Sequence, residues 1–182
     1  MKGRKMMKGF SVRNIVLSAL FLALGFVLPF FTMQIPSIGS MLLPMHIPVI
    51  ICGFVCGAPL GLIVGFILPL LRSLIFTMPP MFPTAIAMAF ELAAYGMISG
   101  YLYNRSDKKV FDIYFSLIVS MIGGRIIWGL VSAILCGFSG QVFGISVFVA
   151  GAFSNAVPGI ILQIILIPVL IVVLQKVKLI GK

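Results

Sequence analysis

The chain has 182 residues, of which 62% are hydrophobic and 9% charged, and its mean hydropathy is +1.27. Soluble domains carry about a quarter charged residues, so this composition excludes a water-soluble fold. The formal net charge of +10 does not indicate nucleic-acid binding, because the basic residues lie in three short clusters between apolar runs. At about 20 apolar residues per crossing, the chain has room for about five or six membrane-spanning helices and no separate soluble domain.

Apolar runs separated by breakers predict an all-α, polytopic membrane protein with six transmembrane helices in one integral membrane domain over residues 1–182. In chain order, the helices are expected at about 12–31, 44–57, 58–77, 84–103, 111–136 and 147–175. The first run follows a basic segment, as in a signal peptide. It is long enough to span and no small-residue cleavage site follows promptly, so we expect a retained helix. Three prolines between Met78 and Pro83 end the third helix.

The second predicted helix is the shortest and contains Pro48, so a re-entrant segment is the alternative to a full crossing. The distribution of charge favours six crossings. With six, the basic N-terminal segment, the loop with Arg105, Lys108 and Lys109, and the basic C-terminal tail share one side, while the other loops contain no lysine or arginine. The positive-inside rule then places both termini in the cytoplasm.

Small residues recur at four-residue spacing in several predicted helices. Such rows let helix backbones approach closely in lipid, so we interpret them chiefly as packing within the bundle. Contact of one row with another protein is the alternative. The rows are Ala19 and Ala23; Gly53, Gly57, Gly61 and Gly65; Ala85, Ala89 and Ala93; and Gly96 and Gly100. The cysteines Cys52, Cys56 and Cys136 lie in apolar stretches without zinc or redox spacing, which indicates buried small hydrophobic residues.

Three ionisable side chains lie inside the apolar runs, namely Arg72, Glu91 and Arg125. Each costs about 2.5–3.5 kcal/mol at the centre of a membrane helix, so each must face the bundle interior and find a partner. Counted from the outer helix ends at 1.5 Å per residue, they lie roughly 8 to 17 Å below the outer surface. The three charges can therefore meet in one layer.

Other polar and aromatic residues fall in the same outer half of the predicted bundle, namely His46, Tyr95, Trp128 and Asn155. With the three charges, they predict a substrate-binding pocket open to the outside. Two arginines and one glutamate leave a charge of +1, which suits a substrate with an anionic or strongly hydrogen-accepting group. The alternative is that Glu91 joins two helices through one arginine, the other arginine reaches outward, and no ligand binds.

The sequence gives little support for catalysis, a metal centre or ATP hydrolysis. Its three acidic residues include Asp107 and Asp112 of the cytoplasmic loop, and no hydrolase or metalloprotease motif is present. No nucleophile with its base is therefore predicted. The single histidine has no partners at metal-ligand spacing, so no metal is expected. Without a nucleotide-binding loop, the chain cannot by itself power transport with ATP, and no cofactor is expected.

Three short motifs accompany the six predicted helices. They are Ala19-x-x-x-Ala23, the loop Gln34-Ile-Pro-Ser-Ile-Gly-Ser40, and Pro44-Met-His-Ile-Pro48 leading into Cys52-Gly-Phe-Val-Cys-Gly57. This pattern covers nearly the whole chain and resembles the substrate-binding S component of an energy-coupling factor (ECF) vitamin transporter. The resemblance implies a prokaryotic plasma-membrane protein that captures a vitamin or its precursor from outside. A separate transmembrane T subunit and two ATPase subunits would drive release inside.

The resemblance also implies roles for two of the motifs. Ala19 and Ala23 would pack against the T subunit. The loop from about Thr32 to Leu43 would close over the substrate, and its notable residues are Gln34, Pro36, Ser37, Gly39 and Ser40. The loaded protein would topple in the membrane to deliver its cargo, which suits outer loops without lysine or arginine.

The vitamin itself is less well defined by the sequence. No motif for riboflavin, thiamine, biotin or folate is evident, and the polar residues favour a vitamin B6 form or pantothenate. The next candidate substrates are a hydroxymethylpyrimidine, nicotinate and a queuosine precursor. The alternative function is an autonomous secondary transporter or channel for a small polar solute, which would need an ion-coupling carboxylate and an internal repeat.

Overall fold

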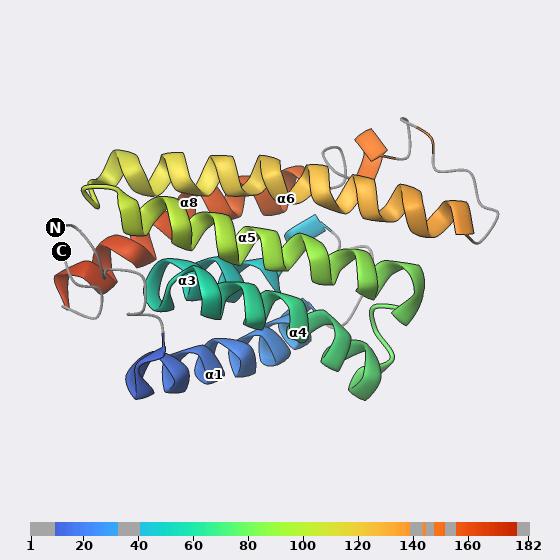
Figure 1. Cartoon of the computed structure of the whole chain (residues 1–182), viewed down its shortest axis with the longest axis horizontal. Helices are drawn as coiled ribbons and strands as arrows, with labels where there is room; N and C mark the ends of the chain where they lie inside the picture. Colours follow the sequence, from blue (N-terminus) through green and yellow to red (C-terminus); the bar gives the residue numbers. More distant parts are fainter. Residues whose placement is uncertain (1–9, 33–40, 139–143, 145–147, 152–155, 178–182) are drawn as a thin grey trace, which may run out of the picture.

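Helices form every regular element in the part of the chain that the structure, a computed structural model, describes. This part comprises residues 10–32, 41–138, 144, 148–151 and 156–177. The elements are α1 (Val12–Val27), the 3-10 turn η2 (Leu28–Thr32), α3 (His46–Cys56), α4 (Ala58–Phe76), the π-helical turn η3 (Met81–Ala85), α5 (Ile86–Arg105), α6 (Val110–Phe138) and α8 (Val157–Lys176). Figure 1 shows the long helices running side by side along the long axis of the molecule.

Capping residues and a glycine set several helix ends. The hydroxyl of Ser11 accepts a hydrogen bond from the backbone N–H of Asn14 at 3.3 Å and caps the start of α1. Gly57 has a φ of 94°, which residues with a side chain rarely adopt, and it separates α3 from α4. The carboxylate of Asp112 accepts from the backbone N–H of Lys109 at 2.9 Å and caps the start of α6.

Five of the described helical segments are long and apolar enough to cross a membrane, and α3 is shorter. Its 11 residues span about 16 Å, roughly half of the hydrocarbon core. The last helix differs in part from the expected single helix over 147–175, since residues 148–151 are helical and α8 begins at Val157. Pro158 lies in its first turn, where proline is favoured. The chain is thus an α-helical membrane protein, and the count of six crossings stays a prediction.

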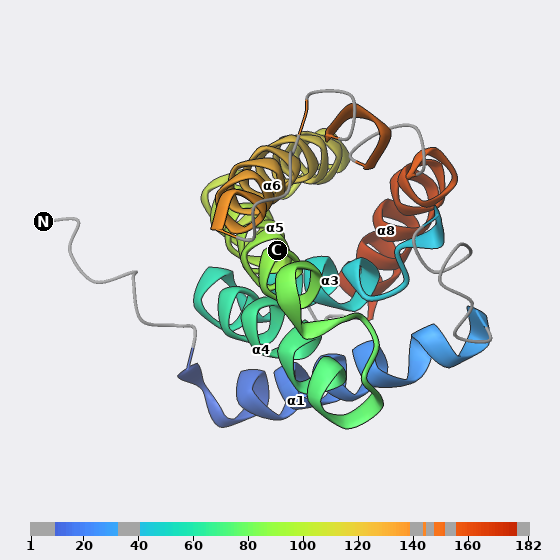
Figure 2. The same ribbon diagram turned by 90° about the vertical axis from the view of Figure 1, so that its right-hand side faces the viewer.

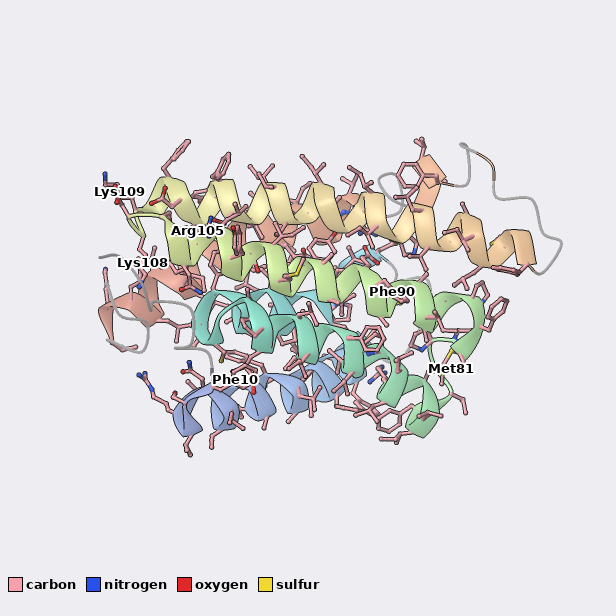
Figure 3. The ribbon with its side chains drawn as sticks, viewed as in Figure 1. Phe10, Met81, Phe90, Arg105, Lys108 and Lys109 are labelled. Carbon is pink, nitrogen blue, oxygen red and sulfur yellow. The ribbon has the colours of Figure 1, made fainter. Side chains whose placement is uncertain are left out.

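The start of α1, the end of α8 and the turn between α5 and α6 lie toward the same end of the molecule (Figure 1). Figure 3 places Phe10, Lys108 and Lys109 toward that end and Met81 toward the opposite one. An even number of membrane crossings requires the start of the first helix and the end of the last helix to lie on the same side of the membrane. The assignment of this basic end to the cytoplasm remains a prediction.

Glycines allow close contact among α3, α4 and α5. A Cβ atom on Gly100 would lie 2.6 Å from the carbonyl oxygen of Gly53, and one on Gly61 would lie 2.6 Å from that of Gly96. Any larger residue would separate these backbones, so the interpretation of the glycine rows as bundle packing is confirmed. The alanine pair of α1 differs, because Ala19 and Ala23 are both exposed on the surface. Cys52 and Cys56 are buried and Cys136 is partly exposed, and none of the three is in a disulfide within the described part of the chain.

Candidate functional site

Three helices bring the side chains of His46, Glu91 and Arg125 together inside the bundle. Glu91 lies fourteen residues before the end of α5, and Arg125 lies fifteen residues after the start of α6, so the two lie at matching heights on neighbouring antiparallel helices. Nη1 of Arg125 is 3.0 Å from Oε1 of Glu91. Nε2 of His46, at the start of α3, is 3.4 Å from the same oxygen. The exposed fractions of His46, Glu91 and Arg125 are 1%, 1% and 6%. We call these three residues the polar cluster.

The polar cluster retains hydrogen-bonding capacity. Among the described residues, no hydrogen-bond partner is found for either ring nitrogen of His46, for Oε1 of Glu91, or for Nε and Nη2 of Arg125. Oε1 of Glu91 meets the ion-pair distances without an aligned N–H, so its attraction to Arg125 is electrostatic more than directional. A buried polar atom without a partner costs about 1–3 kcal/mol. Arg125 is therefore paired by charge and still has two nitrogens that can donate to another group.

One aromatic ring contacts the polar cluster, and an aromatic pair includes a residue one turn away along α6. The ring of Tyr95, one turn after Glu91 on α5, is buried and meets the ring of His46 edge to face at 5.1 Å between centroids. Gly124, next to Arg125, leaves room for the Tyr95 ring, because a Cβ atom there would lie 2.8 Å from that ring. Trp128, one turn beyond Arg125 on α6, stacks on Phe148 at 6.2 Å and 25°. Sequence reasoning missed Phe148, for which the sequence offers no signal beyond its aromatic nature.

Arg72 does not join the polar cluster. Its Nη1 donates to the carbonyl oxygen of Phe26 at 2.8 Å, and its guanidinium lies over the rings of Phe30 at 5.4 Å and Phe76 at 5.2 Å. The Phe26 carbonyl belongs to the last turn of α1, where carbonyls lack partners within the helix. Within the described part of the chain, no carboxylate lies within ion-pair distance of Arg72.

The expected meeting of all three charges is therefore not confirmed, because Arg72 binds the end of α1 instead. The consequence concerns the charge of the site. Glu91 and Arg125 cancel, so the polar cluster is neutral when His46 is neutral, and the expected excess of +1 does not apply to it.

Several predicted residues cannot be placed. Asn155 and the loop residues Gln34, Pro36, Ser37, Gly39 and Ser40 lie outside the described residues. Within the described ranges, no group of three or more histidine, cysteine or acidic side chains could hold a metal ion.

The structure adds a second residue that sequence reasoning missed. Gln163 of α8 is fully buried, and neither its Nε2 nor its Oε1 has a hydrogen-bond partner among the described residues. Its signal was a single glutamine in the middle of a strongly apolar helix. A neutral amide costs less to bury than a charge, so its presence in an apolar helix does not by itself indicate a site.

Comparison with known proteins agrees with this architecture. A family model described as "ECF transporter, substrate-specific component" matches residues 13–171, which include the polar cluster, Arg72 and Gln163. No curated protein and no solved structure gives a match to the chain. Members of the matched family are transport subunits, not enzymes. The chain belongs to the family of ECF transporter substrate-specific components.

Proposed function

We propose that this protein is the membrane-embedded substrate-capture subunit of an ECF-type transporter in a prokaryotic plasma membrane. It imports a water-soluble vitamin or precursor with energy from a separate module, a T subunit and two ATPase subunits. The observation that carries this proposal is the polar cluster. It lies buried in an apolar bundle, and two nitrogens of Arg125 have no hydrogen-bond partner among the described residues. Ionisable groups within membrane helices are costly, and function is the usual reason for their presence.

The candidate substrates remain a vitamin B6 form or pantothenate, then a hydroxymethylpyrimidine, nicotinate or a queuosine precursor. Because the polar cluster has no net charge when His46 is neutral, its attraction for these compounds would come from hydrogen bonds. An acceptor on the substrate would be held by Nε and Nη2 of Arg125, and not by an excess of positive charge. The rings of Tyr95 and Trp128 would provide apolar contact for a ring compound.

Equilibrium binding to the purified protein tests this proposal, with radiolabelled forms of the five candidate compounds as probes. The informative variant is the double substitution Glu91→Gln and Arg125→Met, which removes both charges and leaves no buried charge unpaired. We expect it to fold and to bind about 100-fold more weakly, because bonds to charged groups contribute about 1.5–3 kcal/mol each. Binding of wild-type strength in this variant would refute the site, and binding of none of the five would refute the substrate class.

The matched control removes a charge pair at the surface. Asp107 and Lys109 form an ion pair at 3.2 Å with side chains 79% and 73% exposed. Such a pair contributes little, so Asp107→Asn with Lys109→Gln should leave binding unchanged.

Uptake experiments test the dependence on a partner module. Vesicles with the chain alone should accumulate no substrate, whereas uptake without any ATPase would favour the secondary-transporter alternative. The exposed pair Ala19 and Ala23 is the proposed contact with the T subunit. Ala19→Leu with Ala23→Leu should abolish module-driven uptake and leave binding intact. Ala133→Leu, at an exposed alanine of α6, is the matched control and should leave both intact.

A further inference from the structure

We infer that Gln163 is a fourth member of the substrate site, and that the site selects a ligand with a hydrogen-bond donor beside an acceptor. This inference rests on the proposed function. Gln163 is fully buried, and both polar atoms of its amide lack partners among the described residues. A primary amide offers two donors and an acceptor, and burying them without partners in an apolar interior is unfavourable. A ligand with a complementary edge would satisfy both ends of the amide.

The face of α8 that carries Gln163 points into the bundle. Gly159, Gln163, Ile167 and Ile171 are all buried, and their four-residue spacing puts them on one face of the helix. A Cβ atom on Gly159 would lie 2.9 Å from the carbonyl carbon of Leu42, so this face packs on the segment that leads into α3 and His46. Gln163 follows one turn further along the same face.

The height of Gln163 matches that of the polar cluster. Gln163 lies thirteen residues before the end of α8, close to the fourteen that separate Glu91 from the end of α5. Both helix ends lie toward the same end of the molecule (Figure 1). In the view along the bundle, α3 lies between α5 and α8 (Figure 2), and α8 contacts both α3 and α6. The amide thus approaches the layer of the polar cluster from the side opposite α5.

The combined donors and acceptors define a ligand class. Arg125 supplies donors, Gln163 supplies a donor and an acceptor, and the cluster carries no net charge when His46 is neutral. This set fits a neutral or zwitterionic compound with an amide-like edge, such as a ring lactam, a carboxamide, or a hydroxyl beside a carbonyl. A simple aliphatic acid would satisfy Arg125 and leave the Gln163 donors unpaired.

The test uses the compound that the wild-type protein carries through purification, released with methanol and identified by mass spectrometry. Gln163→Met keeps the shape of the side chain and removes its polar atoms. We expect the amount retained per protein to fall about tenfold or more, while the ligand-free protein unfolds at the same or a higher temperature. A merely structural glutamine, hydrogen-bonded within the protein, would instead lower the unfolding temperature when replaced.

The control is Ser116→Ala on α6, nine residues from Arg125, which removes a buried hydroxyl that also has no hydrogen-bond partner among the described residues. It should retain the compound at the wild-type level. Equal retention by Gln163→Met and wild type would overturn this inference and leave the proposed function intact. A retained simple aliphatic acid would overturn the ligand class. A wild-type protein that carries no compound would contradict the proposed function itself, and the inference with it.

Discussion

Arg72 and Arg125 are both buried in apolar helices, and the structure surrounds them in different ways. Arg72 donates to the Phe26 carbonyl and lies over two phenylalanine rings, and no buried nitrogen of Arg72 lacks a partner in the described part of the chain. Arg125 faces a carboxylate at 3.0 Å and has two unpartnered nitrogens. Burial of a charge therefore does not by itself identify a ligand site. The hydrogen-bonding capacity that the protein leaves unused is the more specific sign.

The largest expected effect comes from Arg125→Met. This change leaves the buried Glu91 carboxylate with His46 as its one remaining ion-pair partner among the described residues, so stability should fall by about 3–5 kcal/mol and substrate binding should be lost. Thermal unfolding in detergent and a binding assay measure the two effects. Adding Glu91→Gln should recover most of the stability and still leave binding about 100-fold weaker than that of the wild type. If Arg125→Met alone were as stable as the wild type and bound substrate as tightly, the pair of Glu91 and Arg125 would have no role.

Arg72→Met should have an intermediate effect on stability and none on binding. The variant loses a charged hydrogen bond to Phe26, which contributes about 1.5–3 kcal/mol, and it leaves no carboxylate unpaired. The same two assays apply. Loss of binding with stability intact would place Arg72 in the site after all and remove the distinction between the arginines.

Phe76→Leu should have the smallest effect. It removes the ring that lies 5.2 Å from the Arg72 guanidinium, a contact that contributes about 0.5–2 kcal/mol. Phe66→Leu is the matched control, because Phe66 forms an edge-to-face pair with Phe90 at 5.4 Å. Phe76 also meets the rings of Phe26 at 6.1 Å and Phe30 at 5.1 Å edge to face, so the difference in unfolding temperature between the two variants sets an upper limit on the contribution of the Arg72 contact. Equal losses would show that the rings stabilise Arg72 no more than they stabilise each other.

Helix positions were largely predictable from the sequence. The helices expected at 58–77, 84–103 and 111–136 correspond to Ala58–Phe76, Ile86–Arg105 and Val110–Phe138. Gly57 and the prolines between Met78 and Pro83 bound the first of these helices and precede the second, and the charged segment 104–109 separates the second from the third. The last helix was less predictable, because the apolar run before Val157 gives no comparable break in hydropathy.

The site was predictable only in part. Counting residues along the helices gives the height of each charge, and this correctly brought Glu91 and Arg125 together. The same count does not give the direction in which a side chain points. Arg72 turns toward α1, to a carbonyl 46 residues earlier in the chain, and no local pattern shows this. Gln163 was missed because whether a buried amide is partnered depends on the three-dimensional packing alone.

Native mass spectrometry of three proteins released from the host membrane tests the central claim most directly. These are the wild type, Arg72→Met, and the double variant Glu91→Gln with Arg125→Met. We expect wild type and Arg72→Met to carry the same small molecule at similar occupancy, and the folded double variant to carry none. A folded double variant that still carries the molecule at wild-type occupancy would contradict the assignment of the substrate site to the polar cluster.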